Sequence, residues 1–142
     1  MANFSRDILF TKVSNGATAG TSEVDSSILD MSGYQGVIFI VDLATVVDAS
    51  VLTLAIQQNT ANSTSGMAAI TGASCTFTAS TSSNTIMFVD VYEPLQRYLR
   101  AAFTRTAQNA TVNTIIALQY KAMKKPTVQG STVLASAFAL GS

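Results

Sequence analysis

Val51-Leu-Thr-Leu-Ala-Ile-Gln57 alternates large apolar residues with small or polar ones. Leu52, Leu54 and Ile56 fall on one side of an extended chain, and the residues between them fall on the other. This period of two is typical of a strand with one buried face, whereas a helix needs apolar residues three or four positions apart. The stretch therefore predicts a half-buried β-strand.

Six further segments are rich in β-branched or aromatic residues and have strand lengths, and an eighth candidate covers residues 27–31. The six are residues 8–13, 37–43, 75–79, 85–92, 99–106 and 112–122. Turn-like clusters of Gly, Ser and Asn separate them, at residues 14–16, 33–36, 59–66, 80–84 and 107–110. Short strands at this spacing predict an all-β fold, an antiparallel β-sandwich with the jelly roll as its preferred form. Residues 95–100, after Pro94, are either a short helix or a loop that leads into the next strand.

The chain of 142 residues has the length of one domain. Residues 126–142 carry no charged side chain, and their few large apolar residues do not offset the backbone entropy of ordering the segment. We therefore expect an N-terminal arm at residues 1–12, one sandwich domain at residues 13–125, and a C-terminal arm at residues 126–142. One or both arms are expected to clasp other subunits.

Charged residues make up only 11% of the chain, and the formal net charge is zero. A surface of this kind has little electrostatic repulsion between copies, which favours association in an assembly. Lysine and arginine are absent between Lys12 and Arg97, so the acidic residues precede Pro94 and most basic residues follow it. If the two segments lie on different faces, the subunit is a dipole suited to a complementary partner. Chance clustering of a few charges is the alternative.

Residues for catalysis are scarce, because the chain has no histidine and a single cysteine, Cys75. No serine lies in a nucleophile motif, and the nearest carboxylate pair, Asp90 and Glu93, fits a solvated strand end better than a glycosidase site. We expect no enzyme activity and no cofactor. A calcium site remains an alternative, with Glu23, Asp25 and Asp30, or Asp42 and Asp48, as oxygen donors.

Membrane and nucleic-acid partners are not expected either. No apolar run approaches the length of a membrane span, and the N-terminus lacks the pattern of a secretory signal. Arg97, Arg100 and Arg105 lie among aromatic residues, but in a strand they alternate between faces instead of forming one basic stripe. We also expect no small-molecule substrate.

The segment Arg97-Tyr-Leu-Arg-Ala-Ala-Phe-Thr-Arg-Thr-Ala-Gln-Asn-Ala110, followed by residues 115–120 and 124–126, resembles the C-terminal half of capsid cement proteins of tailed bacteriophages, also called decoration or head-stabilising proteins. The resemblance covers about a third to a half of the chain and contains no catalytic signature. It implies a β-sandwich or jelly-roll subunit made in the bacterial cytoplasm. It further implies dimers or trimers on the outside of an icosahedral head, where terminal arms bridge the major capsid protein.

From these observations we expect contacts with the capsid or with other subunits at three sets of residues. The sets are Phe4, Arg6 and Ile8 near the N-terminus, the basic residues Arg97, Arg100, Lys124 and Lys125, and the apolar residues Val133, Leu134, Phe138 and Leu140. Two rival functions remain. One is another virion component, such as a neck, tail, fibre-base or small coat protein, and the other is a calcium-dependent carbohydrate-binding sandwich.

Overall fold

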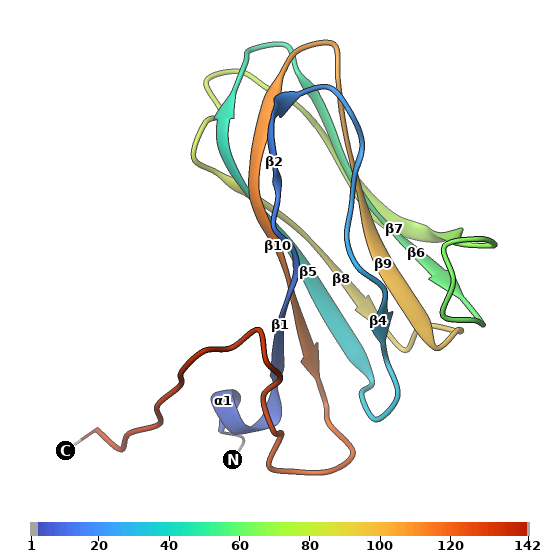
Figure 1. Cartoon of the computed structure of the whole chain (residues 1–142), viewed down its shortest axis with the longest axis vertical. Helices are drawn as coiled ribbons and strands as arrows, with labels where there is room; N and C mark the ends of the chain where they lie inside the picture. Colours follow the sequence, from blue (N-terminus) through green and yellow to red (C-terminus); the bar gives the residue numbers. More distant parts are fainter. Residues whose placement is uncertain (1–2, 142) are drawn as a thin grey trace.

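Two five-stranded antiparallel sheets form the protein, as seen in a computed structural model that describes residues 3–141 (Figure 1). Sheet A contains β1 (Leu9–Ser14), β2 (Ala17–Gly20), β5 (Gly36–Val46), β8 (Ile86–Tyr92) and β10 (Ala110–Tyr120). Sheet B contains β3 (Val24–Asp25), β4 (Leu29–Asp30), β6 (Val51–Asn59), β7 (Ala68–Thr78) and β9 (Tyr98–Thr106). The prediction of an all-β antiparallel sandwich is confirmed.

The strand order is β1-β10-β5-β8 in sheet A, where β2 also pairs with β10. In sheet B the order is β3-β9-β6-β7, and β4 also pairs with β9. The chain changes sheet between β5 and β6, and again at each connection from β7 to β10. The central strands of each sheet are therefore neighbours in space but distant in sequence. The jelly-roll form of the sandwich stays a prediction.

The core lies between the two sheets, where their inner faces meet. Leu52, Leu54 and Ile56 are fully buried, as the alternation in β6 predicts, and they belong to one cluster with Phe39 of β5 and Phe103 of β9. Each of these large side chains stabilises the fold by about 1.5–3 kcal/mol through removal from water. The hydrophobic effect thus fixes the register of β6 and β9, because a slip by one residue would turn their apolar side chains outward.

All seven predicted strands are present, with differences at their ends. β7 begins at Ala68 instead of residue 75, since the strand accommodates extra residues around Gly72 (φ +83°), where its register against β6 shifts. β2 and β3 were not predicted. β2 has four small residues without a clear alternation, and β3 is only two residues long. Residues 95–97 form bends that lead into β9, so the loop alternative was right and the helix was wrong.

The chain ends differ from the expected boundaries. Residues 9–12, expected in an N-terminal arm, form most of β1, which pairs with β10 from Leu9↔Gln119 onward. Residues 4–7 form a single helical turn, α1 (Phe4–Asp7). After β10 the chain turns back, and residues 126–141 have no strand or helix. Both ends lie at the same end of the sandwich (Figure 1).

Candidate interaction surfaces

The C-terminal segment, residues 126–141, is held along the outer edge of β1. Thr127 donates its N–H to the carbonyl of Arg6 (2.7 Å). The side-chain amide of Gln129 accepts from the N–H of Phe10 (2.9 Å) and donates to the carbonyl of Ile8 (2.7 Å). The N–H of Lys12 donates to the hydroxyl of Thr132 (3.1 Å). Side chains of the segment thus satisfy backbone groups that an edge strand would otherwise leave unpaired.

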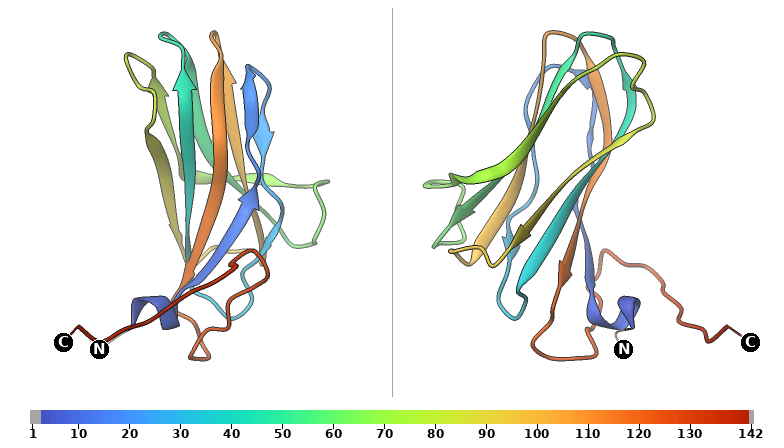
Figure 2. Two further views of the ribbon diagram at one scale, coloured as in Figure 1. Left: turned by 60° about the vertical axis from the view of Figure 1, so that its left-hand side comes forward. Right: turned by 180° about the vertical axis from the view of Figure 1, so that it is seen from behind.

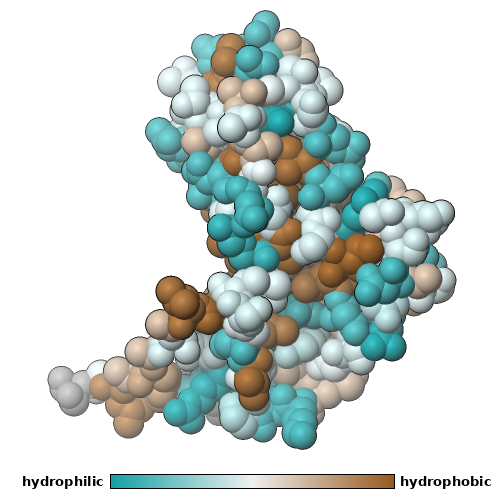
Figure 3. Space-filling model, viewed as in Figure 1, coloured by the Kyte–Doolittle hydropathy of each residue, from teal (hydrophilic) through white to brown (hydrophobic). Residues whose placement is uncertain are grey.

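After its anchored base the C-terminal segment lies on the side of the outer face of sheet A, and its end projects from the body (Figure 2). Leu134 is 100% exposed, Leu140 is 83% exposed and Phe138 is 43% exposed. Brown, apolar atoms dominate this extension in the space-filling view (Figure 3). The segment therefore presents apolar side chains to solvent without any charge among them.

The predicted N-terminal contact residues divide between surface and core. Phe4 is exposed and packs edge-to-face on Phe10, with ring centroids 6.2 Å apart. The guanidinium of Arg6 lies over the ring of Phe138, 4.9 Å from its centroid, so the structure brings Arg6 and the C-terminal segment together. Ile8 is buried, and its assignment as a surface contact was wrong. It lies just before the first strand, outside the main core cluster, where Gln129 of the C-terminal segment bonds its carbonyl.

The predicted basic contact residues are mostly engaged within the chain. Arg97 makes a two-pronged ion pair with Asp30 (2.9 Å for each bond), and Arg100 lies 3.5 Å from the carboxylate of Asp25. The hydrogen bonds from Arg97 lower the pKa of the Asp30 carboxyl below its ordinary value. These pairs join the acidic and basic parts of the sequence across β3, β4 and β9. Segregation of charge along the chain is therefore not segregation in space at these residues.

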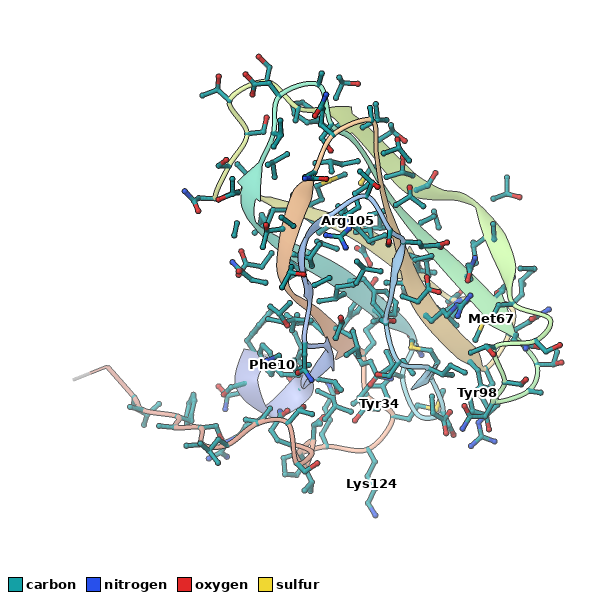
Figure 4. The ribbon with its side chains drawn as sticks, turned by 45° about the horizontal axis from the view of Figure 1, so that its top comes forward. Phe10, Tyr34, Met67, Tyr98, Arg105 and Lys124 are labelled. Atoms are coloured by element: carbon teal, nitrogen blue, oxygen red, sulfur yellow. The ribbon has the colours of Figure 1, made fainter. Side chains whose placement is uncertain are left out.

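The remaining basic residues lie elsewhere. Lys125 is 3.8 Å from Asp7, while Lys124 is exposed and points away from the body (Figure 4). Arg105 is 4% exposed and points between the sheets (Figure 4), where it donates to the carbonyls of Thr18, Ser22 and Ala110. Desolvation lowers the pKa of its guanidinium. Arg105 thus links β2 and the loop after it to β9 and β10.

The outer face of sheet A is apolar, which the sequence reasoning missed. Neighbouring residues on the paired strands form one row of Lys12, Ile116, Ile40 and Phe88, and a second row of Phe10, Leu118, Ile38 and Asp90. Ile86 lies in a third row, together with Asp42 of β5 and Thr114 of β10. We call the six residues Ile38, Ile40, Ile86, Phe88, Ile116 and Leu118 the apolar face. All six are partly or largely exposed.

A signal for this face was present in the sequence. Residues 37–41 and 115–118 are continuous apolar runs, and such runs are typical of strands that are covered on both sides. Their significance depends on pairing, because only the fold makes β5, β8 and β10 neighbours.

Two open grooves border the apolar face. One of about 500 Å³ lies at the ends of β7 and β8, and its lining includes Cys75, Phe77, Ile86 and Phe88. Desolvation raises the pKa of the Cys75 thiol. The other, of about 560 Å³, separates the C-terminal segment from β1 and β10. Neither groove has a charged residue in its lining except Lys12 at the second.

Among residues 3–141, no group of three or more Cys, Asp or Glu side chains is arranged to hold a metal ion. Two of the carboxylates considered for calcium, Asp25 and Asp30, face arginines instead. No helix in the same range is long and apolar enough to cross a membrane.

Comparisons with known proteins inform the fold. No family model matches the sequence, and no curated protein matches it. The structure is similar to the PBSX exported protein XepA, at 16% identity and a TM-score of 0.56 over 98% of this chain. The chain spans 46% of the length of XepA. At this identity the likeness shows a shared β fold.

Two further solved structures match the chain with TM-scores below 0.5. One is a subunit from the disulfide-linked pili of Bacillus endospore appendages, at 14% identity and a TM-score of 0.49, covering 84% of this chain and 93% of that one. The other is Eiger TNF from S. frugiperda, at 13% identity and a TM-score of 0.45, covering 88% and 99%.

Proposed function

We propose that the chain is a structural protein of a virion and, more specifically, a capsid cement protein of a phage head. In this role it binds the outside of an icosahedral shell, as a dimer or trimer, and bridges subunits of the major capsid protein. The protein acts by binding alone, without a catalytic step or cofactor. The observation that carries the proposal is the C-terminal segment, which is anchored at its base and projects exposed apolar side chains.

The anchored base and the projecting end have different roles. Hydrogen bonds from Thr127, Gln129 and Thr132 hold the base against α1 and β1. Beyond it, Leu134 and Leu140 are largely exposed in the isolated chain, while Phe138 is partly covered by Arg6. Full burial of an exposed side chain of this kind against a partner contributes about 1.5–3 kcal/mol, so the projecting end can supply a substantial part of a binding free energy.

Stabilisation of a shell follows from such binding by mass action. A protein that binds only the expanded shell stabilises that state in proportion to the logarithm of its free concentration over Kd. Many copies on one head act together, so a modest interface per subunit is sufficient. The low content of charged residues and the zero net charge also favour association into an assembly over a free monomer. The resemblance at residues 97–110 supports the choice of a head protein.

The test measures binding to purified expanded phage heads that lack the protein, by co-sedimentation and electron microscopy. Full-length protein is expected to saturate the heads at regular positions. A chain without residues 133–142 keeps the anchors and should melt at the same temperature, but bind at least about 10-fold more weakly. Leu95→Ala is the matched control, because Leu95 is 91% exposed in the turn before β9.

Three outcomes contradict the proposal to different degrees. Equal binding of the truncated and full-length chains to the heads would show that the C-terminal segment does not contact the shell. Closed rings without shell binding would replace cement with a neck or tail component, and a melting temperature raised by calcium would favour the carbohydrate-binding alternative.

A further inference from the structure

We propose that the apolar face of sheet A packs against the same face of a second copy of this chain. A two-fold axis parallel to the strands relates the two copies, and Leu134 of the C-terminal segment of each copy lies against the β8 edge of the other. The proposal deepens the proposed function by naming the first partner of the subunit. The inference rests on the proposed function in one respect, which is that the protein works as part of an assembly.

The two outer faces of the sandwich differ in chemistry. On sheet B the central strands β6 and β9 present Thr53 opposite Thr104, and Gln57 opposite Arg100. Thr53 also bonds the hydroxyl of Thr76 on β7 (3.0 Å), so this face is polar and internally hydrogen-bonded. The corresponding positions of sheet A hold the apolar face. An antiparallel sheet with one solvated face alternates apolar and polar residues, and sheet A does not.

The edge strand β8 also exposes apolar side chains that a partner could cover. Within residues 3–141, β8 pairs only with β5, and Ile86 and Phe88 on it are each 59% exposed. A long edge strand with exposed apolar side chains is an aggregation hazard that native proteins protect. The opposite edge, β1, is protected by Gln129 and Thr132. The unprotected edge and the apolar face are therefore continuous and require one partner.

Charge positions favour a second copy as that partner. Lys12 lies on β1 at one edge of sheet A, and Asp90 lies on β8 at the other edge, one row away. Rotation about an axis parallel to the strands places the β1 edge of one copy over the β8 edge of the other. Each Lys12 then lies one row from an Asp90 of its partner, within reach of its long side chain, and this occurs twice per dimer. The Asp90 carboxylate also accepts from the Tyr120 hydroxyl of its own chain (2.6 Å). An isologous interface requires such self-complementarity.

The area available explains why the C-terminal segment takes part. Four strands spaced by about 4.8 Å and seven residues long cover roughly 400 Å² per copy. A stable interface buries about 800 Å² per partner. The segment leaves the body beside β1 on the outer side of sheet A (Figure 2), where the β8 edge of the partner lies in this arrangement. Leu134, at the start of the extension, adds apolar area to this interface, while Leu140 nearer the end stays free for the shell.

The first experiment measures the mass of the isolated full-length protein by light scattering and sedimentation. With a chain mass of 14.9 kDa, two copies give 2 × 14.9, about 30 kDa. Ile40→Lys places a charge in the centre of the face in both copies and should weaken the dimer at least about 100-fold. Thr104→Lys is the matched control on sheet B and should leave the dimer intact, with folding of both variants checked by circular dichroism.

A second experiment on the unmodified sequence tests the arrangement independently of any variant. A zero-length carbodiimide cross-linker is applied to a mixture of ¹⁴N- and ¹⁵N-labelled protein. We expect an isotopically mixed peptide pair that joins Lys12 to Asp90. Within one chain these residues are three strand spacings apart, about 14 Å, which is too far for this reagent.

A monomer at about 100 µM, a dimer that survives Ile40→Lys, a dimer without the Lys12–Asp90 cross-link, or a trimer would each overturn the proposal. Failure of this inference is separable from failure of the proposed function. A monomer that still saturates heads refutes only the self-association. A dimer of the predicted form that ignores heads refutes only the cement role.

Discussion

Replacement of Gln129 by alanine should release the C-terminal segment from β1. The Gln129 amide makes the two short bonds that join the segment to the body next to α1, one with the N–H of Phe10 and one with the carbonyl of Ile8. A third contact, from the same amide to the carbonyl of Ser5, is longer at 3.5 Å. The variant loses these bonds and leaves the backbone of β1 open to water.

The magnitude follows from the two short bonds. A hydrogen bond of this kind contributes about 1 kcal/mol net, because water replaces it when it is broken. Two bonds give about 2 kcal/mol, which raises the ratio of detached to attached segment about 30-fold. Overall stability should change much less, since the core does not depend on the segment.

Amide hydrogen exchange followed by NMR measures this change directly. The Phe10 N–H points to Gln129, while the N–H of Thr11, which pairs with Ala117 of β10, points to the other side of the strand. In Gln129→Ala the Phe10 amide should exchange up to about 30-fold faster, and the Thr11 amide should be unchanged. Gln108→Ala, at an exposed glutamine in the turn before β10, is the matched control. An unchanged Phe10 amide in Gln129→Ala would refute the anchoring role of this side chain.

Two further predictions concern the arginines. Arg105→Met should lower the free energy of unfolding by about 3 kcal/mol, because three carbonyls lose a buried charged donor, and Arg105→Lys should lose less. Urea unfolding measures both, and a loss under about 0.5 kcal/mol would contradict the role of Arg105. Arg97→Gln should lower the free energy of unfolding only slightly at neutral pH, since the pair with Asp30 is exposed and solvent-screened. Because the pKa of Asp30 is lower in the folded state than its ordinary 3.8, this stability is present above 3.8 and is lost as the pH falls through the folded value. If the difference in free energy of unfolding between wild type and Arg97→Gln stays constant in acid, the pair with Asp30 does not cause that difference.

The strand content of the protein could be predicted because it depends on short-range pattern. The alternation at residues 51–57 and the turn clusters between strands report which side chains must leave water. Errors arose where local pattern is weak. β2 is short and lacks a clear alternation, the first half of β7 is interrupted by Gly72, and Ile8 lies so close to the chain end that its burial has no periodic signal.

The surface properties depend on contacts between distant residues. Asp30 and Arg97 are far apart in the sequence and meet because β4 pairs with β9, so charge order along the chain did not indicate charge order in space. Arg105, which the sequence analysis placed on the other side of the strand from Arg100, is buried because it faces inward on β9 and donates to three carbonyls.

The sequence by itself therefore determined the fold class, the positions of the main strands and the uncharged, apolar character of the C-terminal segment, because these depend on each residue and its near neighbours. Only the tertiary structure decided which strands adjoin. That pairing made the apolar face from β5, β8 and β10, cancelled the expected dipole at Asp25 and Asp30, and placed the segment beside β1. The physical reason is that side-chain burial is encoded locally, whereas a surface is assembled from strands that come together only on folding.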